Sequence, residues 1–407
     1  MAGPLPDATV RPASPLMNPQ TACVLIVDDI DENRDNHERR LKRMGIASIE
    51  QATNGREALA AIERRSFDLV LLDIMMPEMD GFEVLQHLKA HGRLTDLPVI
   101  VISALSDLEP VVRCIELGAE DFILKPFNAT LLRARILAML EKKKLRDQVR
   151  EELARKQAEL AEARTLQLAL VPANYRGHHH GRRVSIDIVL EPAREVGGDL
   201  VDHFVIGDEL LVVLIGDVSG KGAGPALMMA RTQALFRGLL SRPDVLEIFR
   251  APERAADLVN AVLTRGNDSC MFVTMLLAVM DLQTGCLRCV CAGHVAPFLS
   301  RAGGAVERVQ CDPDLPLGLM DGDYRYRSTA LTLAARDHLL IVTDGVTEAT
   351  NPSEALFGEE RVVDFLGQPP GDHTVVSLLR QVREFESGMP SFDDVAAVHL
   401  RYEEADR

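Results

Sequence analysis

The sequence contains no uninterrupted apolar run of about 20 residues, the length that a helix needs to cross a bilayer. It also lacks an excess of positive charge. The 45 Lys and Arg residues stand against 61 Asp and Glu residues, which gives a formal net charge of −16. Such an acidic balance disfavours binding to nucleic acid or to an anionic membrane surface. We therefore expect neither a nucleic acid nor a membrane among the partners of this chain.

Cysteine is too scarce and too irregular for a disulfide framework. There are seven, an odd number, and their one close cluster has no second pair at zinc-site spacing. We expect reduced thiols in a cytoplasmic protein. Residues 1–20 lack the basic start and the apolar core of a signal peptide, so we expect a disordered leader there. With 407 residues and 47% apolar content, the chain is large enough for two or three packed domains.

The segment 21–140 alternates short apolar runs with amphipathic stretches. Unbroken apolar runs of this kind are typical of parallel strands covered on both faces, and they lie at 23–27, 68–72, 98–102 and 121–125. Helix-like stretches separate them, near 31–44, 55–64, 82–90 and 108–117. The pattern predicts an α/β domain with a doubly wound, parallel five-stranded sheet. The ligand site of such a sheet lies beyond the carboxyl ends of its strands.

Polar residues follow the strands at that edge. Asp28 and Asp29 come after the first strand, and the third, fourth and fifth strands are followed by Asp73, Ser103 and Lys125. Three carboxylates together need a counter-charge, and Mg²⁺ is the natural one. A carboxylate placed there would accept a phosphoryl group. Mg²⁺ and Lys125 would offset the charge on its oxygens, and Ser103 would donate a hydrogen bond to one of them.

These residues belong to four motifs: VDD (27–29), LLDIMMPEMDG (71–81), SA (103–104) and KPF (125–127). In combination they resemble the receiver domain of two-component response regulators. The resemblance implies that Asp73 is the phosphoacceptor and that a histidine kinase or a phosphorelay donor is a partner. Ser103 and Phe122 would reorient on phosphorylation. The implied Mg²⁺ ligands are Asp28, Asp29, Asp73 and the carbonyl of Met75. The alternative is a degenerate receiver that serves only in dimerisation.

Between Asn128 and Ala169 the chain contains neither Pro nor Gly. Apolar residues recur at helical spacing here, charges of both signs fill the other positions, and Pro172 ends the run. We expect a long helix that leaves the receiver domain and forms a helical connector over 141–172. The heptads are imperfect, so both a coiled coil that makes a homodimer and a solvated helix remain open.

The segment 173–403 contains consecutive strand-like stretches with few crossovers, which predicts an α-β-β-α sandwich. The triple histidine at 178–180 is expected in an exposed loop. Acidic residues lie at strand ends up to two hundred positions apart, namely Asp199, Asp217, Asp344 and the pair Asp393 and Asp394. Carboxylates gathered in this way suggest one site for hard divalent cations, with the Val218 carbonyl as a further oxygen ligand. Paired ions bridged by an aspartate would activate water for in-line attack on phosphorus.

Four motifs place these acids in a family order: EVGGDLVD (195–202), IGDVSGKGAGPALMMA (215–230), TDGVTEATN (343–351) and DDVAAVHL (393–400). Over residues 165–402 the chain resembles the Mg²⁺/Mn²⁺-dependent serine/threonine protein phosphatases, above all the bacterial branch that controls stress and sporulation sigma factors. The resemblance implies two Mn²⁺ or Mg²⁺ ions with Asp217 as the bridging, catalytic ligand. Its metal ligands would be Asp199, Asp217, Val218 (carbonyl), Asp344 and either Asp393 or Asp394. Arg194 is either a phosphate-binding residue or an ordinary surface arginine.

Together the two resemblances imply a response regulator whose output is dephosphorylation of phosphoserine or phosphothreonine on a partner protein, controlled through Asp73. The branch implies an anti-sigma-factor antagonist as that partner. The alternative from another class is a pseudophosphatase, a module that sequesters a partner without turnover. The sequence leaves open the cognate kinase, the substrate, the choice between Mg²⁺ and Mn²⁺, and whether phosphorylation activates or inhibits.

Overall fold

The computed structural model describes residues 21–104, 108–302, 304–320, 324–368 and 374–404. The leader expected at 1–20 therefore lies outside the described residues. The chain divides into two compact units, Met1–Lys156 and Gln157–Arg407. Among the described helices, none is both long and apolar enough to cross a membrane. All seven cysteines are free thiols.

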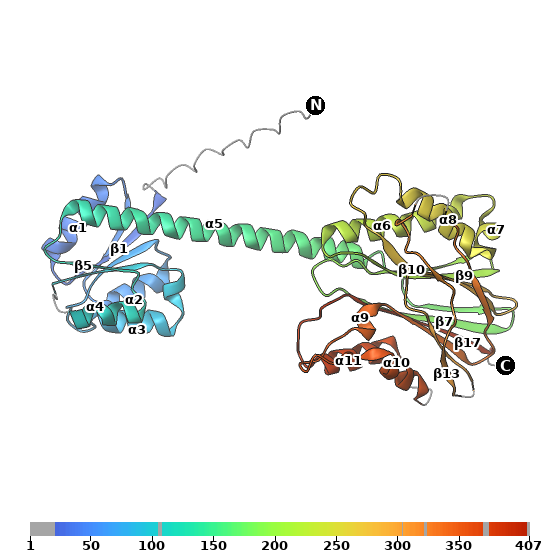
Figure 1. Ribbon diagram of the computed structural model, residues 1–407. Coiled ribbons are helices and arrows are strands. Elements are labelled where there is room, and N and C mark those ends of the chain that lie inside the picture. The colour runs from blue at the N-terminus through green and yellow to red at the C-terminus, as the bar shows by residue number, and fades with distance from the viewer. Residues whose placement is uncertain (1–20, 105–107, 303, 321–323, 369–373, 405–407) are drawn as a thin grey trace, which may run out of the picture. The chain divides into compact units, whose positions relative to one another are not determined.

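The first unit contains a parallel sheet in the order β2-β1-β3-β4-β5. Its strands are β1 (Cys23–Val27), β2 (Ser48–Ala52), β3 (Leu69–Asp73), β4 (Val99–Ser103) and β5 (Asp121–Leu124). Its helices are α1 (Asp31–Arg43), α2 (Gly55–Arg64), α3 (Gly81–Ala90), the 3₁₀ turn η2 (Arg93–Thr95), α4 (Leu108–Leu117) and the start of α5 (Ala129–Leu168). Helices α1 and α5 cover one face of the sheet, and α2, α3 and α4 cover the other (Figure 1). The predicted doubly wound fold is confirmed.

Local sequence accounts for these elements. The central strands β1, β3 and β4 are buried on both faces, which is why they consist almost entirely of Val, Leu and Ile. Asn54 caps α2 by accepting a hydrogen bond from the backbone N–H of Glu57. Asp80 and Glu83 form a capping box at the start of α3. These caps fix the residues at which α2 and α3 begin.

Helix α5 continues without a break through the boundary between the two units. In the first unit, Leu132 and Ile136 pack against the sheet, and Arg146 forms an ion pair with Glu120 at 3.3 Å. Further along, Val149 and Leu153 are more than half exposed. The sequence of α5 thus has a packed beginning followed by a stretch that displays apolar side chains.

The second unit is built on two six-stranded sheets. The first has the order β14-β11-β10-β9-β8, with β15 paired to β11, and the second has the order β13-β12-β16-β17-β7-β6. The strands of the first sheet are β8 (Leu200–Ile206), β9 (Leu210–Val218), β10 (Val273–Asp281), β11 (Cys286–Ala292), β14 (Pro313–Asp314) and β15 (Thr329–Thr332). Those of the second are β6 (Tyr175–His179), β7 (Arg182–Glu191), β12 (Phe298–Ser300), β13 (Val306–Arg308), β16 (Asp337–Val342) and β17 (Val395–Glu404).

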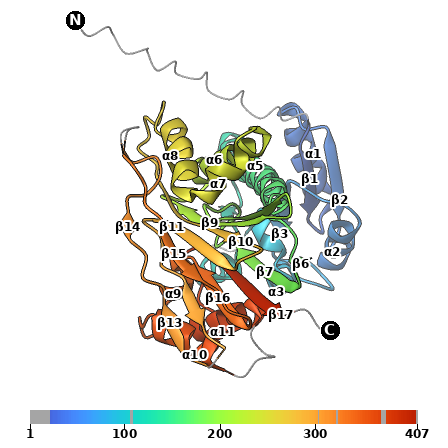
Figure 2. The same ribbon diagram turned by 90° about the vertical axis from the view of Figure 1, so that its right-hand side faces the viewer.

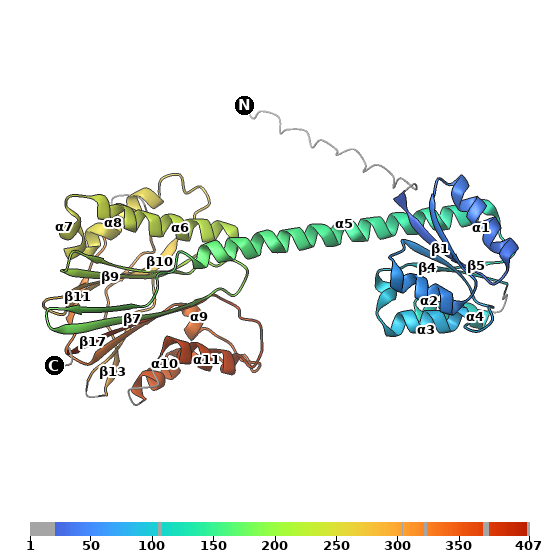
Figure 3. The same cartoon turned by 180° about the vertical axis from the view of Figure 1, so that it is seen from behind.

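Helices cover the outer face of each sheet. On the first sheet these are α6 (Ala223–Gly238), η3 (Leu239–Ser241), α7 (Val245–Arg250) and α8 (Pro252–Leu263). On the second they are α9 (Asp344–Thr347), α10 (Gly358–Gly367) and α11 (Val375–Glu386). Figure 3 shows the four layers, and one apolar core lies between the sheets while two others lie beneath the helices. The predicted α-β-β-α sandwich is confirmed. The prediction of an exposed loop at 178–180 is wrong for His178 and His179, which belong to β6 and pair with β7.

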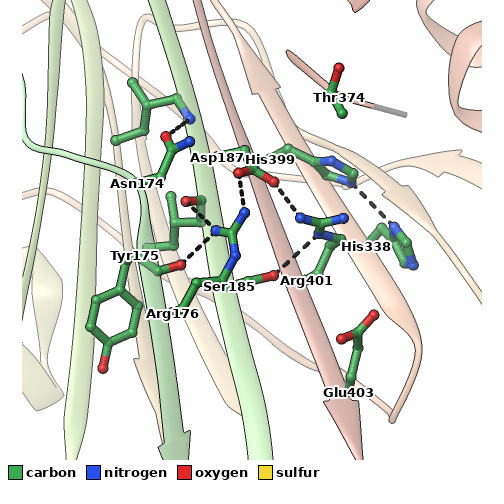
Figure 4. A network of polar contacts seen from close by, with 12 residues as sticks. Asn174, Tyr175, Arg176, Ser185, Asp187, His338, Thr374, His399, Arg401 and Glu403 are labelled. Atoms are coloured by element: carbon green, nitrogen blue, oxygen red, sulfur yellow. Dashed lines mark hydrogen bonds and ion pairs between the residues drawn. The ribbon is translucent and has the colours of Figure 1, made fainter. Parts of the chain in front are cut away.

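The second sheet also carries a polar network that is separate from the candidate site. Asp187 on β7 is buried and forms ion pairs with Arg176 on β6 and Arg401 on β17 (Figure 4). Arg401 also donates to the Ser185 hydroxyl at 3.2 Å. A buried carboxylate needs such partners. The network therefore ties three adjacent strands together and serves the fold.

Candidate active site

The first site lies at the carboxyl edge of the parallel sheet. Asp28, Asp29 and Asp73 each offer a carboxylate oxygen, and these oxygens lie within 4.8 Å of one another. The Lys125 ammonium donates to Asp73 at 2.6 Å and to Asp28 at 2.9 Å. Three carboxylates and one ammonium are therefore brought together, and the negative charge that remains calls for a further cation. Their donor set of carboxylate oxygens fits Mg²⁺.

Burial and the lysine act in opposite directions on these acids. Burial raises the pKa of Asp73 above its ordinary value, against the lowering effect of the hydrogen bond from Lys125. Burial also pushes the pKa of Asp28 upward, but hydrogen bonds from Lys125, Asn33 and the Ile30 N–H outweigh it and leave that pKa lowered. Asp28 is therefore the more firmly ionised of the two.

The other predicted receiver residues occupy the same edge. Asp73 pairs with Ile102 across β3 and β4, so Ser103 lies one position further along the neighbouring strand. Ser103 is fully buried, and its carbonyl accepts from the Lys125 N–H at 2.8 Å. The Met75 N–H points to Asp73 at 3.3 Å, while its side chain is exposed. The structure brings all of these backbones to one edge.

The second site collects acids from four segments of the sandwich. Asp217 lies at the end of β9, Asp344 follows β16, and Asp199 precedes β8. The pair Asp393 and Asp394 directly precedes β17, which lies beside β16 (Figure 2). In the part of the chain that the structure describes, these acids are spaced more widely than the receiver acids. The sandwich nevertheless brings four distant segments to one region.

Burial and the charges of neighbouring acids act together on these carboxylates. Burial raises the pKa of Asp199 well above its ordinary value, and the charges of Asp217 and Asp394 raise it further. Burial raises the pKa of Asp217 to about 7, with Asp344, Asp393 and Asp394 as the next causes. Like charges that are buried together need a counter-charge. Oxygen donors in such an arrangement suit hard divalent cations, so the residues fit the expected metal ions.

The two adjacent aspartates have different surroundings. Both carboxylate oxygens of Asp394 accept backbone hydrogen bonds, from Ala193 at 2.8 Å and from Gly198 at 2.6 Å. Asp394 is only 8% exposed. Asp393 is more open, and its Oδ2 forms an ion pair with Lys221 at 3.2 Å. The geometry therefore leaves Asp393 as the better candidate ligand and gives Asp394 to the support of the loop before Asp199.

Glycines permit the close approach of these segments. A Cβ on Gly198 would lie 2.8 Å from the Val218 carbonyl oxygen and 3.1 Å from Asp217 Oδ1. A Cβ on Gly345 would lie 1.8 Å from the Asp394 carbonyl oxygen. A side chain at Gly198 would therefore crowd two candidate donors, and one at Gly345 would collide with the backbone that precedes β17. The glycine beside Asp199 and the glycine after Asp344 are required by the geometry of the site.

One contact of the site was not predicted from the sequence. Gln167, in the last turn of α5, donates to the Gly197 carbonyl at 2.7 Å and accepts from the Gly197 N–H at 3.0 Å. Gln167 is 7% exposed. On the other side of the same loop, Thr343 donates to Asp199 at 2.9 Å. The loop that carries Asp199 is thus held by the end of the long helix.

The predicted phosphate-binding residue has no such support. The Arg194 side chain is exposed, and the one contact described for this residue is its carbonyl, which accepts from Arg164 at 3.0 Å. Sequence reasoning missed Lys221, whose ammonium faces Asp393. The available signal was its position between two glycines, four residues after Asp217.

Comparison with known proteins matches two regions of the chain to families. Residues 24–137 match the response regulator receiver domain, and residues 207–403 match Stage II sporulation protein E (SpoIIE). The chain therefore contains a receiver domain followed by a SpoIIE-type phosphatase domain. In the second unit the fold is that of the SiaA-PP2C domain of Pseudomonas aeruginosa, with a TM-score of 0.51 and 18% identity over 61% of this chain and 98% of that chain.

Curated relatives match parts of the chain. Protein IcfG of Synechocystis sp. is 27% identical over 239 residues, which are 52% of this chain and 37% of that protein. The probable transcriptional regulator ycf27 of Cyanidium caldarium is 40% identical over 119 residues, which are 29% of this chain and 46% of that protein. The chain thus spans less than half the length of these curated relatives.

Proposed function

We propose that this protein is a response regulator whose phosphatase domain removes phosphate from phosphoserine or phosphothreonine of a partner protein, under the control of Asp73. The observation that carries the proposal is the set of buried, mutually repelling aspartates in a domain of the SpoIIE phosphatase type. A binding module without turnover would have no need to keep such repulsion in its core, because replacing one acid would relieve it.

We assign the metal ligands from the geometry described above. Asp199, Asp217, the Val218 carbonyl, Asp344 and Asp393 would hold two divalent cations in the phosphatase domain. When bound, these ions would supply Lewis acidity and a nucleophilic water for attack on phosphorus. The charges of Asp344, Asp393 and Asp394 all act on Asp217, which supports a central role for it. In the receiver, Asp28, Asp29, Asp73 and the Met75 carbonyl would hold Mg²⁺, with Lys125 and Ser103 contacting the phosphoryl oxygens.

Helix α5 supports control of one site by the other. It begins in the receiver fold, and its last turn holds the Gly197 backbone through Gln167. Phosphorylation of Asp73 by a histidine kinase or a phosphorelay donor would change the packing of the helix, and the loop before Asp199 would respond. Val149 and Leu153 display apolar surface along this helix, which supports a homodimer formed through the connector.

The substrate follows from the branch that the sequence resembles. There the phosphoprotein is an anti-sigma-factor antagonist, which binds its anti-sigma partner once the phosphate is removed. We assign the same class of substrate to this protein. Incubation with candidate phosphorylated antagonists, followed by measurement of the intact mass, tests the assignment through the loss of one phosphate.

Hydrolysis itself is tested with an aryl phosphate. We expect Mn²⁺-dependent release of p-nitrophenol from p-nitrophenyl phosphate by the full chain, and its loss in Asp217→Ala. Asp364→Ala on the exposed face of α10 is the matched control. A wild-type protein that binds Mn²⁺ but releases no phenol, from this ester or from a phosphopeptide, would show that the domain is a sequestering module.

Control by the receiver is tested with the phosphoacceptor. We expect a small phosphoryl donor such as acetyl phosphate to change the rate of the wild-type protein and to leave Asp73→Asn unchanged. Asp35→Asn, an exposed position on α1, serves as the control. Equal responses of the wild type and Asp73→Asn would exclude control by this residue.

A further inference from the structure

The phosphatase unit has one lysine. Residues 157–407 contain many arginines, and Lys221 is the only lysine among them. It lies in the loop between β9 and α6, four residues after Asp217. Gly220 and Gly222 flank it, both with φ of +99°. The left-handed conformation at both neighbours lets the backbone turn sharply around this one side chain.

Three contacts hold its ammonium beside Asp393 of the acidic site. Nζ forms an ion pair with Asp393 Oδ2 at 3.2 Å. It also donates to the Phe392 carbonyl and lies 4.0 Å from the centroid of the Phe392 ring. The lysine side chain is 30% exposed. The ammonium is therefore held next to a candidate metal ligand and remains accessible from solvent.

From these contacts we propose that Lys221 binds the phosphate of the substrate in the phosphatase domain. The inference rests on the function proposed above. Two divalent cations would not outweigh the five carboxylates of the site (Asp199, Asp217, Asp344, Asp393 and Asp394), so a phosphate dianion needs a further positive contact. A ligand bond from Asp393 to a cation weakens its attraction for the ammonium. A phosphate oxygen then becomes the stronger partner for Lys221.

Phe392 completes the contact region. Its ring is 80% exposed although it is apolar, and it lies directly before Asp393. The ring supports the ammonium through a cation–π contact. Its open face is available to the peptide that carries the phosphorylated side chain. Lys221 thus recognises the phosphate, while Phe392 adds contact with a protein substrate that a small ester cannot use.

Steady-state kinetics test the assignment. In Lys221→Met we expect the KM for p-nitrophenyl phosphate and the inhibition constant of inorganic phosphate to rise about tenfold or more, which is the size of one lost charge-assisted hydrogen bond. We expect kcat to change less, and Lys221→Arg to restore part of the loss. Lys156→Met, outside the phosphatase unit, is the control.

Two further measurements separate binding of phosphate from support of the metal site. Calorimetric titration should show Mn²⁺ binding to Lys221→Met at least as tightly as to the wild type, because the ammonium no longer competes with the cation for Asp393. Weaker Mn²⁺ binding, with KM restored at saturating Mn²⁺, would overturn the proposal, because Lys221 would then only position residues 392–393. Unchanged KM and inhibition constant would overturn it as well.

The single lysine also provides a readout that does not depend on hydrolysis. In the Mn²⁺-loaded wild type, inorganic phosphate should protect Lys221 from an amine-acylating reagent, as measured by peptide mass spectrometry, while Lys156 stays reactive. Absence of protection would count against Lys221 even in an active enzyme. A protected Lys221 in a protein without turnover would instead leave the phosphate site standing and overturn the hydrolytic function.

Discussion

Gln167 offers the most direct test of whether the long helix acts on the candidate phosphatase site. The substitution Gln167→Leu keeps a side chain of similar size and removes the amide. Two hydrogen bonds to Gly197, at 2.7 and 3.0 Å, are then lost. Their loss leaves the buried N–H and carbonyl of Gly197 without these partners. Each such group costs about 1–3 kcal/mol, so we take about 2–4 kcal/mol for the pair, allowing for some entry of water.

This free energy acts on the loop that carries Asp199. If the loop is ordered only when metal binds, the lost free energy is subtracted from the free energy of metal binding. Each 1.4 kcal/mol then weakens the metal affinity about tenfold. We expect Mn²⁺ to bind Gln167→Leu at least about tenfold more weakly, as measured by titration calorimetry. Hydrolysis of p-nitrophenyl phosphate should fall at low Mn²⁺ and recover as Mn²⁺ approaches saturation.

Gln157→Leu is the matched control, because Gln157 lies on the same helix and is exposed. It should bind Mn²⁺ like the wild type. The reasoning would be refuted if Gln167→Leu lowered the unfolding temperature of the phosphatase unit and left Mn²⁺ affinity unchanged. The contact would then serve stability alone, and α5 would need another route to the site.

Two further predictions concern the acids and a buried histidine. Asp393→Asn should abolish Mn²⁺-dependent turnover with little change in melting temperature. Asp394→Asn should lower the melting temperature by several degrees, because it loses a backbone hydrogen bond that contributes about 1–2 kcal/mol. If calorimetry showed the larger drop in melting temperature for Asp393→Asn, the two residues would exchange roles. Burial lowers the pKa of His37 to about 4, so between pH 6.5 and 4 the unfolded chain binds a proton that the folded receiver does not. Through this group the free energy of unfolding of the receiver should fall by about 2 kcal/mol between pH 8 and pH 5. In His37→Phe, urea titrations at the two pH values should no longer show that fall. An equal acid sensitivity in the variant would contradict the assignment.

The fold was largely predictable, because the buried strands are nearly pure Val, Leu and Ile. The strands that escaped prediction have edge positions or short lengths. β2 reads SIEQA and β6 reads YRGHH, and both lie at the edge of a sheet where one side meets solvent. Their polar side chains therefore carry no apolar signal. The backbone hydrogen bonds to a neighbouring strand decide their conformation, and these depend on the tertiary structure.

Only those parts of the two sites that residue type and motif reveal could be predicted from the sequence. Aspartates at strand ends and in motifs could be identified as candidate ligands, and the receiver acids do lie together. The sequence could not separate Asp393 from Asp394, since the difference lies in which backbone N–H groups reach each carboxylate. Gln167 and Lys221 contact residues 30 and 171 positions away. Such partners are set by packing of distant segments, which one sequence does not reveal.

The way in which Asp199 is held bears on how regulation would work. The loop before it is held by Gln167 from α5 and by Asp394 from the segment before β17, while Thr343 from the end of β16 donates to its carboxylate. Burial and the charges of neighbouring acids also raise the pKa of Asp199 well above its ordinary value. An acid that is costly to ionise needs both its cation and its supporting contacts. Movement of the last turn of α5 would therefore change the affinity of the site for metal before it changed any step of the chemistry. A regulator acting through this helix gains control over turnover without touching the substrate.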